Sequence, residues 1–235
     1  MKTVRRGWQE EDERFFSSEE MEKLSLSAYE CAFLLERGYP LQSAVTFTAN
    51  HRLLSQRQRI AMGRITVCPS RLRMRKAREM DHLDPGCTVH IDALNAVILM
   101  ETALSHSVIL QCMDGCIRDL SGLAGTYAII SVTDEAITRI LKKLTQLGAS
   151  KAVFWIDSPV SNSGRLKQRI ADCADRLQFP VDLQMVHNAD TELKKLDHVI
   201  SGDSEIIEQC KSWFNLYPLL INDIEDPWIV HLDPY

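Results

Sequence analysis

Three short apolar runs in the second half of the chain each lead into an aspartate, and this pattern restricts the fold more than any other feature. The acids are Asp92, Asp157 and Asp203. Segments with helical periodicity separate the apolar runs, and such alternation of strands and helices is typical of a parallel sheet covered on both faces. Because parallel strands end at the same edge of their sheet, we expect the three carboxylates to gather there.

Residues 85–235 are therefore expected to form one α/β domain, with a mostly parallel central sheet flanked by helices. The expected strands cover residues 88–92, 108–111, 152–156, 181–186, 199–200 and 228–232. The expected helices cover residues 94–105, 134–147, 165–177 and 203–213. No element is assigned to residues 113–132, and so long a loop inside a compact domain is usually functional or mobile.

The N-terminal third shows helical periodicity instead. We expect residues 1–20 to be a flexible tail and residues 21–84 to be a small all-helical module. Four helices are expected there, one ending at Gly38 and the others covering residues 41–49, 56–64 and 71–80. A capping box at Ser55 opens the third of them. Such a set of short helices is compatible with a helix-turn-helix, but no recognition-helix pattern is clear.

The chain has a net charge of −5, but its charges are unevenly distributed. Residues 51–80 contain nine basic residues and one acid, Glu79, which gives +8, so the remaining residues must total −13. A basic block on an acidic chain indicates a face that binds a polyanion beside an acidic site. The alternative is a helical face whose arginines pair with acids elsewhere in the protein.

Three carboxylates crowded at one sheet edge repel one another unless a cation neutralises them. Mg²⁺ or Mn²⁺ suits such a site, because hard cations take oxygen ligands. Asp119 is a further candidate ligand, whereas Asp114 before a glycine is more typical of a turn. Glu101 is expected either to point back at the site or to face solvent. The alternative interpretation of the three strand-end acids is that they are ordinary helix N-caps.

A cation held by these acids would activate water and stabilise charge on a phosphate during in-line displacement. The basic block would then hold the backbone of a nucleic acid. Its candidate contacts are Arg57, Arg59, Arg64, Arg71, Arg73 and Arg75. Ser158 and Ser161, which precede Gly164 and a helix, resemble an anion-binding loop.

Two segments resemble the motifs of a nuclease fold. Residues 91–95, Ile-Asp-Ala-Leu-Asn, are similar to the D-x-x-N strand and helix of the NYN branch of PIN-like nucleases. Residues 201–205, Ser-Gly-Asp-Ser-Glu, resemble the S-G-D-S-D segment of that fold, with Glu205 in place of its second aspartate. The resemblance implies a metal-dependent ribonuclease that uses the three strand-end acids, with Asn95 orienting a ligand or water. At Glu205 the longer side chain would still reach a metal ion.

Residues 24–216 also resemble an uncharacterised family of archaeal and bacterial proteins with an N-terminal helical domain of unknown function. The segments that carry this resemblance are residues 35–39, 56–59, 114–115, 118–121, 157–161 and 201–204. This second resemblance implies no activity.

The first expectation is thus a Mg²⁺- or Mn²⁺-dependent ribonuclease or RNA-processing phosphodiesterase, with RNA as its partner. The alternative is a non-catalytic nucleic-acid-binding or adaptor protein on a degenerate PIN-like fold. An enzyme acting on a phosphorylated small molecule would use residues 158–164, but no Walker pattern supports it. PIN-like proteins are often dimers, so a homodimer is also considered.

The location is expected to be cytoplasmic. No apolar run reaches the roughly 18 residues of a membrane span, so no membrane partner is expected. None of the seven cysteines forms a CxxC pair, and several lie within apolar periodicity. We therefore expect reduced cysteines that pack as small hydrophobic side chains.

Overall fold

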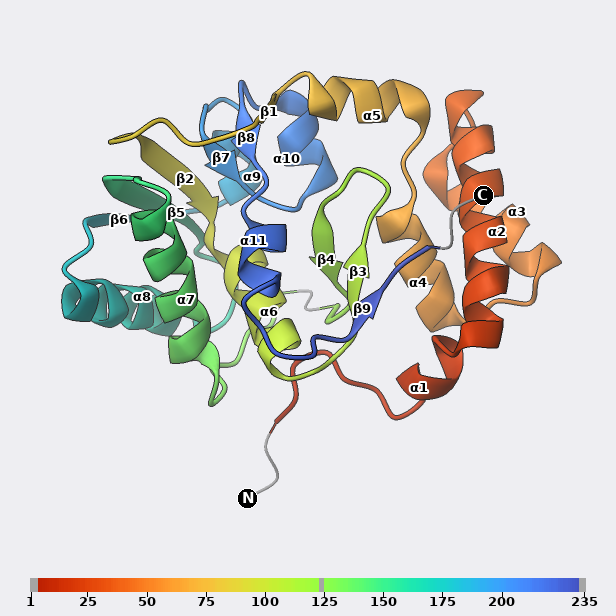
Figure 1. Ribbon diagram of the computed structural model, residues 1–235, viewed down its shortest axis with the longest axis horizontal. Coiled ribbons are helices and arrows are strands. Elements are labelled where there is room, and N and C mark those ends of the chain that lie inside the picture. Colours follow the sequence, from red (N-terminus) through yellow and green to blue (C-terminus); the bar gives the residue numbers. More distant parts are fainter. Residues whose placement is uncertain (1–3, 123–124, 233–235) are drawn as a thin grey trace.

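The computed structural model describes residues 4–122 and 125–232, and its central element is a six-stranded sheet with the order β1-β8-β7-β2-β5-β6. All neighbouring strands in this sheet are parallel. Its strands are β1 (Glu79–Met80), β2 (Thr88–Asp92), β5 (Lys151–Asp157), β6 (Val181–Val186), β7 (Val199–Ile200) and β8 (Trp213–Phe214). The chain continues from β2 to β5 and β6 on one side and to β7 and β8 on the other, so the strand order reverses beside β2 (Figure 1).

The two faces of this sheet pack against different helices. The face that carries Ile91 and Phe154 is buried with α6 (Ala93–Leu104), α7 (Thr133–Gln146), α8 (Ser163–Leu177) and α11 (Tyr217–Ile221). The face that carries Trp155 and Trp213 is buried with α9 (Ala189–Leu193) and α10 (Ser204–Gln209). Burial on both faces explains why the strands are near-continuous apolar runs rather than alternating ones. The predicted mostly parallel α/β architecture is confirmed.

The N-terminal helices form a second layer beside this sheet (Figure 1). They are α2 (Ser18–Glu36), α3 (Leu41–His51), α4 (Gln56–Ile65) and α5 (Pro69–Lys76). The predicted capping box is present, because the Ser55 side chain accepts from the Gln58 backbone while the Gln58 side chain accepts from the Ser55 backbone. The predicted helical N-terminal part is confirmed.

The core of these helices is completed by residues from the other half of the chain. A three-stranded sheet, with the order β4-β3-β9, lies between the helices and the six-stranded sheet (Figure 1). Its strands are β3 (Ile109–Gln111), β4 (Ile117–Asp119) and β9 (Ile229–Val230). Leu110 and Val230 are buried in one cluster with Leu24 and Met62 of the helices. The boundary that we predicted near residue 84 therefore does not separate two independent cores.

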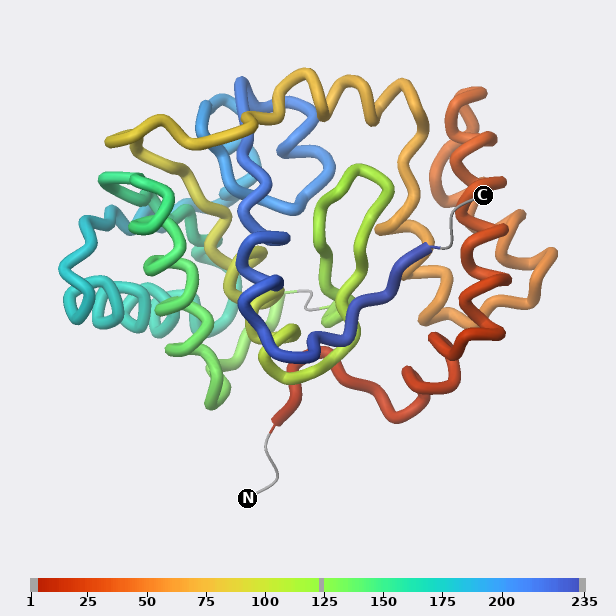
Figure 2. Tube along the Cα trace, in the orientation of Figure 1, coloured from red at the N-terminus to blue at the C-terminus, as the bar shows by residue number. Residues whose placement is uncertain are grey.

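The segment before α2 is packed, although we expected residues 1–20 to be a flexible tail. Within its described part, Arg6 is 7% exposed and forms a 2.7 Å ion pair with Glu101 of α6. Asp12, in the short helix α1 (Asp12–Phe15), is fully buried and forms a 2.8 Å ion pair with Arg57 of α4. Figure 2 shows this segment running from the end of α6 to the helical layer. The segment thus connects the two parts, and the prediction of a free tail is wrong for residues 4–20.

Three further expectations differ from the structure. The helix predicted over residues 71–80 ends at Lys76, because Glu79–Met80 instead forms β1 and pairs with β8. The helix predicted over residues 203–213 ends at Gln209 for the same reason, since Trp213–Phe214 is β8. The unassigned stretch 113–132 contains β4, which pairs antiparallel with β3. In each case, pairing with a distant strand decides the local conformation.

Two global expectations can be compared with the structure. All seven cysteines are free, and six of them are buried, as expected for small hydrophobic side chains. Within the part of the chain that the structure describes, no helix is both long and apolar enough to cross a membrane.

Candidate functional site

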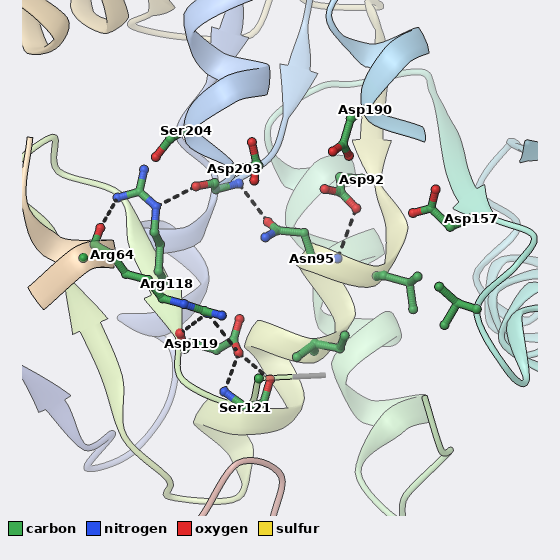
Figure 3. Close-up of a pocket in the computed structure, with 16 residues that line it drawn as sticks. Arg64, Asp92, Asn95, Arg118, Asp119, Ser121, Asp157, Asp190, Asp203 and Ser204 are labelled. Atoms are coloured by element: carbon green, nitrogen blue, oxygen red, sulfur yellow. Dashed lines mark hydrogen bonds and ion pairs between the residues drawn. The ribbon is translucent and has the colours of Figure 1, made fainter. Parts of the chain in front are cut away.

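Four aspartates from the carboxyl-terminal edge of the six-stranded sheet line one pocket, together with Asp119 of the three-stranded sheet, and the volume of this pocket is about 410 Å³. Asp92 ends β2, Asp157 ends β5, Asp203 follows β7 and Asp190 lies in α9, which follows β6. Figure 3 shows these side chains around a common space, which we term the acidic pocket. The acidic pocket lies where the strand order reverses, which is the place where open parallel sheets bind ligands.

Asp92 is held in the deepest position by its neighbours. Its side chain is 7% exposed, caps α6 by accepting a 3.1 Å hydrogen bond from the Asn95 backbone nitrogen, and accepts a 3.2 Å bond from the Ser201 hydroxyl. The pKa of Asp92 is raised to about 7, chiefly because burial disfavours the charged carboxylate. The hydrogen bond from Asn95 opposes this shift, whereas the charges of Asp190, Asp203 and Asp157 add to it.

Asp203 and Asp157 are also bound to backbone nitrogens. Oδ1 of Asp203 caps α10 by accepting hydrogen bonds of 2.7 and 3.2 Å from Glu205 and Ile206. Oδ1 of Asp157 accepts a 2.8 Å bond from the Ala189 backbone nitrogen. The alternative that these acids are helix caps is therefore correct for Asp92 and Asp203, and capping coexists with a place in the pocket. Asp157 and Asp203 each bind backbone nitrogens through Oδ1, which leaves Oδ2 available for a ligand in the acidic pocket.

These four aspartates lack an ion-pair partner in the part of the chain that the structure describes. Nearby Lys194 instead pairs with Glu205 at 2.8 Å. Burial raises the pKa of Asp190, and repulsion from Asp203 and Asp157 adds to this effect. Within the same described residues, no three acidic, histidine or cysteine side chains converge closely enough to hold a metal ion. The acids therefore share a pocket and repel one another, but they do not form a closed coordination shell.

Asn95 is fixed from two directions. Its Oδ1 atom accepts a 2.8 Å hydrogen bond from the Gly202 backbone nitrogen and a 2.8 Å bond from the Tyr217 hydroxyl. Tyr217 is 1% exposed, so its hydroxyl is held in place by packing. With both bonds on Oδ1, the amide Nδ2 of Asn95 is the donor that is left for the pocket.

A second wall of the acidic pocket comes from α4 and the three-stranded sheet. Arg64 of α4 donates to the backbone oxygen of Asp119 at 2.5 Å, and its guanidinium lies 3.6 Å from the Asp119 carboxylate. The Asp119 carboxylate also accepts a 2.7 Å bond from the Ser121 backbone nitrogen. Asp119, which we predicted as a metal ligand, thus lines the pocket but is paired with Arg64 (Figure 3).

The other candidate ligand, Glu205, and the two loop serines do not line the acidic pocket. Glu205 is exposed and pairs with Lys194, so it is not brought to the other acids. Ser158 and Ser161 are also exposed, and the Ser161 hydroxyl accepts a 3.1 Å bond from the Tyr127 backbone nitrogen. Glu101 neither faces solvent nor lines the pocket, because it is fully buried against Arg6 and Tyr127.

The arginines of the basic block have very different environments. Arg57 and Arg75 are 7% and 4% exposed and are ion-paired, the first with Asp12 and the second with Asp114 and Glu208. Neither is accessible to a nucleic acid, so our prediction is wrong for these two residues. The alternative of a helical face paired with distant acids describes them correctly.

The remaining arginines are accessible to different degrees. Arg59 is partly buried and donates to the Leu54 backbone oxygen at 2.9 Å. Arg64 is 36% exposed and lines the acidic pocket. Arg71 is 62% exposed, 3.7 Å from Glu208, and Arg73 is 72% exposed, 3.7 Å from Glu36.

Three residues of the site were not predicted from the sequence. Asp190 is not among the predicted site residues, although it follows the strand ending at Val186 and the rule used for the other acids applies to it as well. Arg118 and Tyr217 reach the site from β4 and α11, two elements that were not predicted. No pattern near Arg118 or Tyr217 in the sequence indicates these contacts.

Comparison with known proteins identifies related sequences without a known activity. The model of a domain of unknown function, DUF5616, matches residues 84–218, and that of a protein family of unknown function, DUF434, matches residues 23–78. An uncharacterized protein from Methanocaldococcus jannaschii is 32% identical over 177 residues, which cover 75% of this chain and 85% of that protein. No solved structure matches the chain significantly.

Proposed function

The chain belongs to the family of the domain of unknown function DUF5616, and we propose that it is a Mg²⁺- or Mn²⁺-dependent ribonuclease or RNA-processing phosphodiesterase. One observation carries this proposal: four carboxylates at or just after the ends of neighbouring strands share one pocket, and among the described residues none of them forms an ion pair. The similarity of residues 91–95 and 201–205 to motifs of PIN-like nucleases of the NYN branch supports the same chemistry.

The donor set of the acidic pocket suits a hard divalent cation, because all of its candidate ligands are oxygens. Asp92, Asp157, Asp190 and Asp203 would hold the ion. Asp157 and Asp203 contribute the oxygens that their backbone contacts leave available. Because no three of these acids converge in the structure, binding would require their side chains to move towards one another. The bound cation would neutralise the mutual repulsion of the carboxylates, and this favours the movement.

A bound Mg²⁺ or Mn²⁺ would lower the pKa of water and stabilise negative charge on a phosphate. The chain itself positions the substrate. The Nδ2 amide of Asn95 donates to a phosphate oxygen or to water, and its orientation is fixed by Gly202 and Tyr217. Arg64 presents a partly exposed guanidinium to the same pocket and is placed to contact a phosphate.

The test is cleavage of a labelled single-stranded RNA by the purified protein with Mn²⁺, with Mg²⁺ and with EDTA. We expect cleavage only with the metal ions, and we expect Asp92→Asn to abolish it while the protein stays folded. The matched control is Asp175→Asn, because Asp175 is an exposed acid of α8 outside the pocket. This variant should cleave normally. Equal cleavage by Asp92→Asn and the control would contradict the proposal.

A second candidate is a non-catalytic nucleic-acid-binding or adaptor protein on a degenerate PIN-like fold. It is favoured by the capping roles of Asp92 and Asp203 and by the lack of a converged ligand set among the described residues. This candidate predicts salt-sensitive RNA binding without metal-dependent turnover. The same assay, combined with an RNA titration at several ionic strengths, distinguishes the two candidates.

A further inference from the structure

A second groove adjoins the acidic pocket. Its volume is about 420 Å³, and it lies between the α2–α3 turn, the link from α4 to α5 and the start of α10. Gly63 and Ser204 line both the groove and the acidic pocket, so the two spaces meet at these residues. Figure 1 shows α5 running from the helical layer towards α10. We term this space the side groove.

An exposed aromatic ring and an exposed arginine both line the side groove. Tyr39 is 54% exposed, and Arg71 is 62% exposed with only a 3.7 Å contact to Glu208. Arg75 also lines the groove, but its guanidinium is occupied by Asp114 and Glu208. Arg71 is therefore the lining cation that can exchange a weak surface pair for a ligand. The groove combines a stacking surface with one accessible positive charge.

These features match the chemistry of single-stranded nucleic acid. Bases of a single strand stack on aromatic side chains, whereas bases inside a duplex stack on one another and leave no free face for Tyr39. A phosphate next to the one at the acidic pocket would find Arg71 in the adjoining groove. Because Gly63 and Ser204 line both spaces, a single strand with one phosphate at the acidic pocket would pass these two residues to reach the side groove.

We propose that the side groove binds a nucleotide of a single-stranded nucleic acid adjacent to the phosphate held at the acidic pocket. The base of this nucleotide stacks on Tyr39, and its phosphate contacts Arg71. This inference rests on the proposed function, because it extends the same substrate beyond the acidic pocket. It identifies the substrate as single-stranded and at least a few nucleotides long.

The test is binding of fluorescent oligouridine and oligothymidine, four and eight nucleotides long, to the full-length protein in EDTA, followed by anisotropy. Tyr39→Ala should weaken binding of the eight-nucleotide strands about tenfold, in the range of one lost base stack, whereas Tyr39→Phe should bind normally. Arg71→Ala should lower the slope of log affinity against log salt by about 0.7, as expected for one lost phosphate contact on a single strand. Equal effects with both oligomers indicate recognition of base and phosphate, and a larger effect with oligouridine indicates an added contact to the 2′-hydroxyl.

The matched controls are Phe47→Ala and Arg176→Ala. Phe47 is 70% exposed, and Arg176 is 57% exposed with a 3.8 Å pair to Asp134, and neither lines the side groove. Both should bind like the unmodified protein. Because all four altered side chains are exposed, the variants should also unfold at the same temperature as the unmodified protein.

The proposal is overturned if Tyr39→Ala and Arg71→Ala bind like these controls, or if no single strand binds at all. Its failure is separable from failure of the proposed function, because cleavage is measured independently with Asp92→Asn. Tyr39-dependent binding without metal-dependent cleavage would keep the side groove and reject the nuclease. Metal-dependent cleavage with no effect of Tyr39→Ala or Arg71→Ala on binding would keep the nuclease and reject the side groove.

Discussion

The Nε atom of Arg118 donates a 2.7 Å hydrogen bond to the carbonyl oxygen of Gly202, and this bond ties the three-stranded sheet to the loop that carries Asp203. Asp114 holds the same guanidinium through bonds of 3.0 and 2.6 Å. Although burial would raise the pKa of Asp114, the guanidinium groups of Arg118 and Arg75 hold it at about 2. A buried ionic network thus sets the position of the acidic pocket relative to the helical layer.

We expect Arg118→Met to destabilise the protein by about 3 kcal/mol, because it removes one partner from a buried, hydrogen-bonded ion pair. Urea unfolding followed by circular dichroism measures this change. The comparison is Lys195→Ala, which removes an exposed pair with Glu192 and should cost about 0.5 kcal/mol or less. Similar losses in both variants would show that the buried network does not set the stability of this junction.

We expect Tyr217→Phe to remove the 2.8 Å hydrogen bond that orients Asn95. Loss of such an orienting bond should lower kcat of RNA cleavage about tenfold with little change in KM. Stability should fall by only about 1 kcal/mol. Tyr39→Phe removes an exposed hydroxyl instead and should leave both quantities unchanged. A change in KM alone would argue against a positioning role for Tyr217.

The raised pKa of Asp92 should make the stability of the metal-free protein depend on pH. The native carboxyl group has a pKa of about 7 and the ordinary value is 3.8, so between these values the native state binds a proton that the unfolded state has released. Stability due to this group therefore decreases as the pH rises from about 4 to about 7 and then stays constant. In Asp92→Asn this decrease should be absent. Urea unfolding of both proteins from pH 5 to pH 8 tests the difference, and parallel curves would contradict the assignment.

Mn²⁺ should raise the unfolding temperature of the protein more at pH 8 than at pH 6. At the lower pH the ion must displace the proton of Asp92, which weakens binding and therefore stabilisation. Asp92→Asn should lose most of the Mn²⁺-dependent shift, whereas Asp175→Asn should keep it. A shift that is the same in all three proteins would place the ion outside the acidic pocket.

We expect Asp12→Ala to destabilise the protein by about 3 kcal/mol, because it leaves the guanidinium of Arg57 buried without its partner. Asp182→Ala, which breaks an exposed pair with Lys151, should cost less than about 1 kcal/mol. Thermal and urea unfolding of the two variants measure this contrast. An Asp12→Ala variant as stable as Asp182→Ala would mean that the N-terminal segment is loosely attached in solution.

The strand-end acids illustrate what could be predicted. Asp92 and Asp157 directly end apolar runs, and parallel strands bring such ends together regardless of the details of packing. Asp190 obeys the same rule but is separated from its strand by a short link, so the rule applied to the last residue of each apolar run does not find it. The role of Asp92 as a helix cap could also be predicted from the sequence, because capping depends on residues that are close in sequence.

The basic block illustrates the opposite case. Arg57 and Arg75 belong to the same run of positive charge as Arg71, yet two are buried in ion pairs and one is exposed. Their partners, Asp12, Asp114 and Glu208, lie far away along the chain, so no local pattern distinguishes the buried arginines from the exposed one. The same reason explains why β1 and β8 were predicted as ends of helices.

The sequence by itself determined the parallel sheet, the edge at which the aspartates gather and the helices of the N-terminal layer, because these features depend on periodicity and on neighbouring residues. Only the tertiary structure decided which charges are buried, that the three-stranded sheet completes the helical core, and that Gly63 and Ser204 line both the side groove and the acidic pocket. These features depend on contacts between segments about a hundred residues apart, such as Arg118 with Gly202 and Tyr217 with Asn95. The surroundings then set the charge state of each carboxyl group. Buried arginines stabilise the charged form of Asp114, whereas burial and neighbouring acids destabilise the charged form of Asp92.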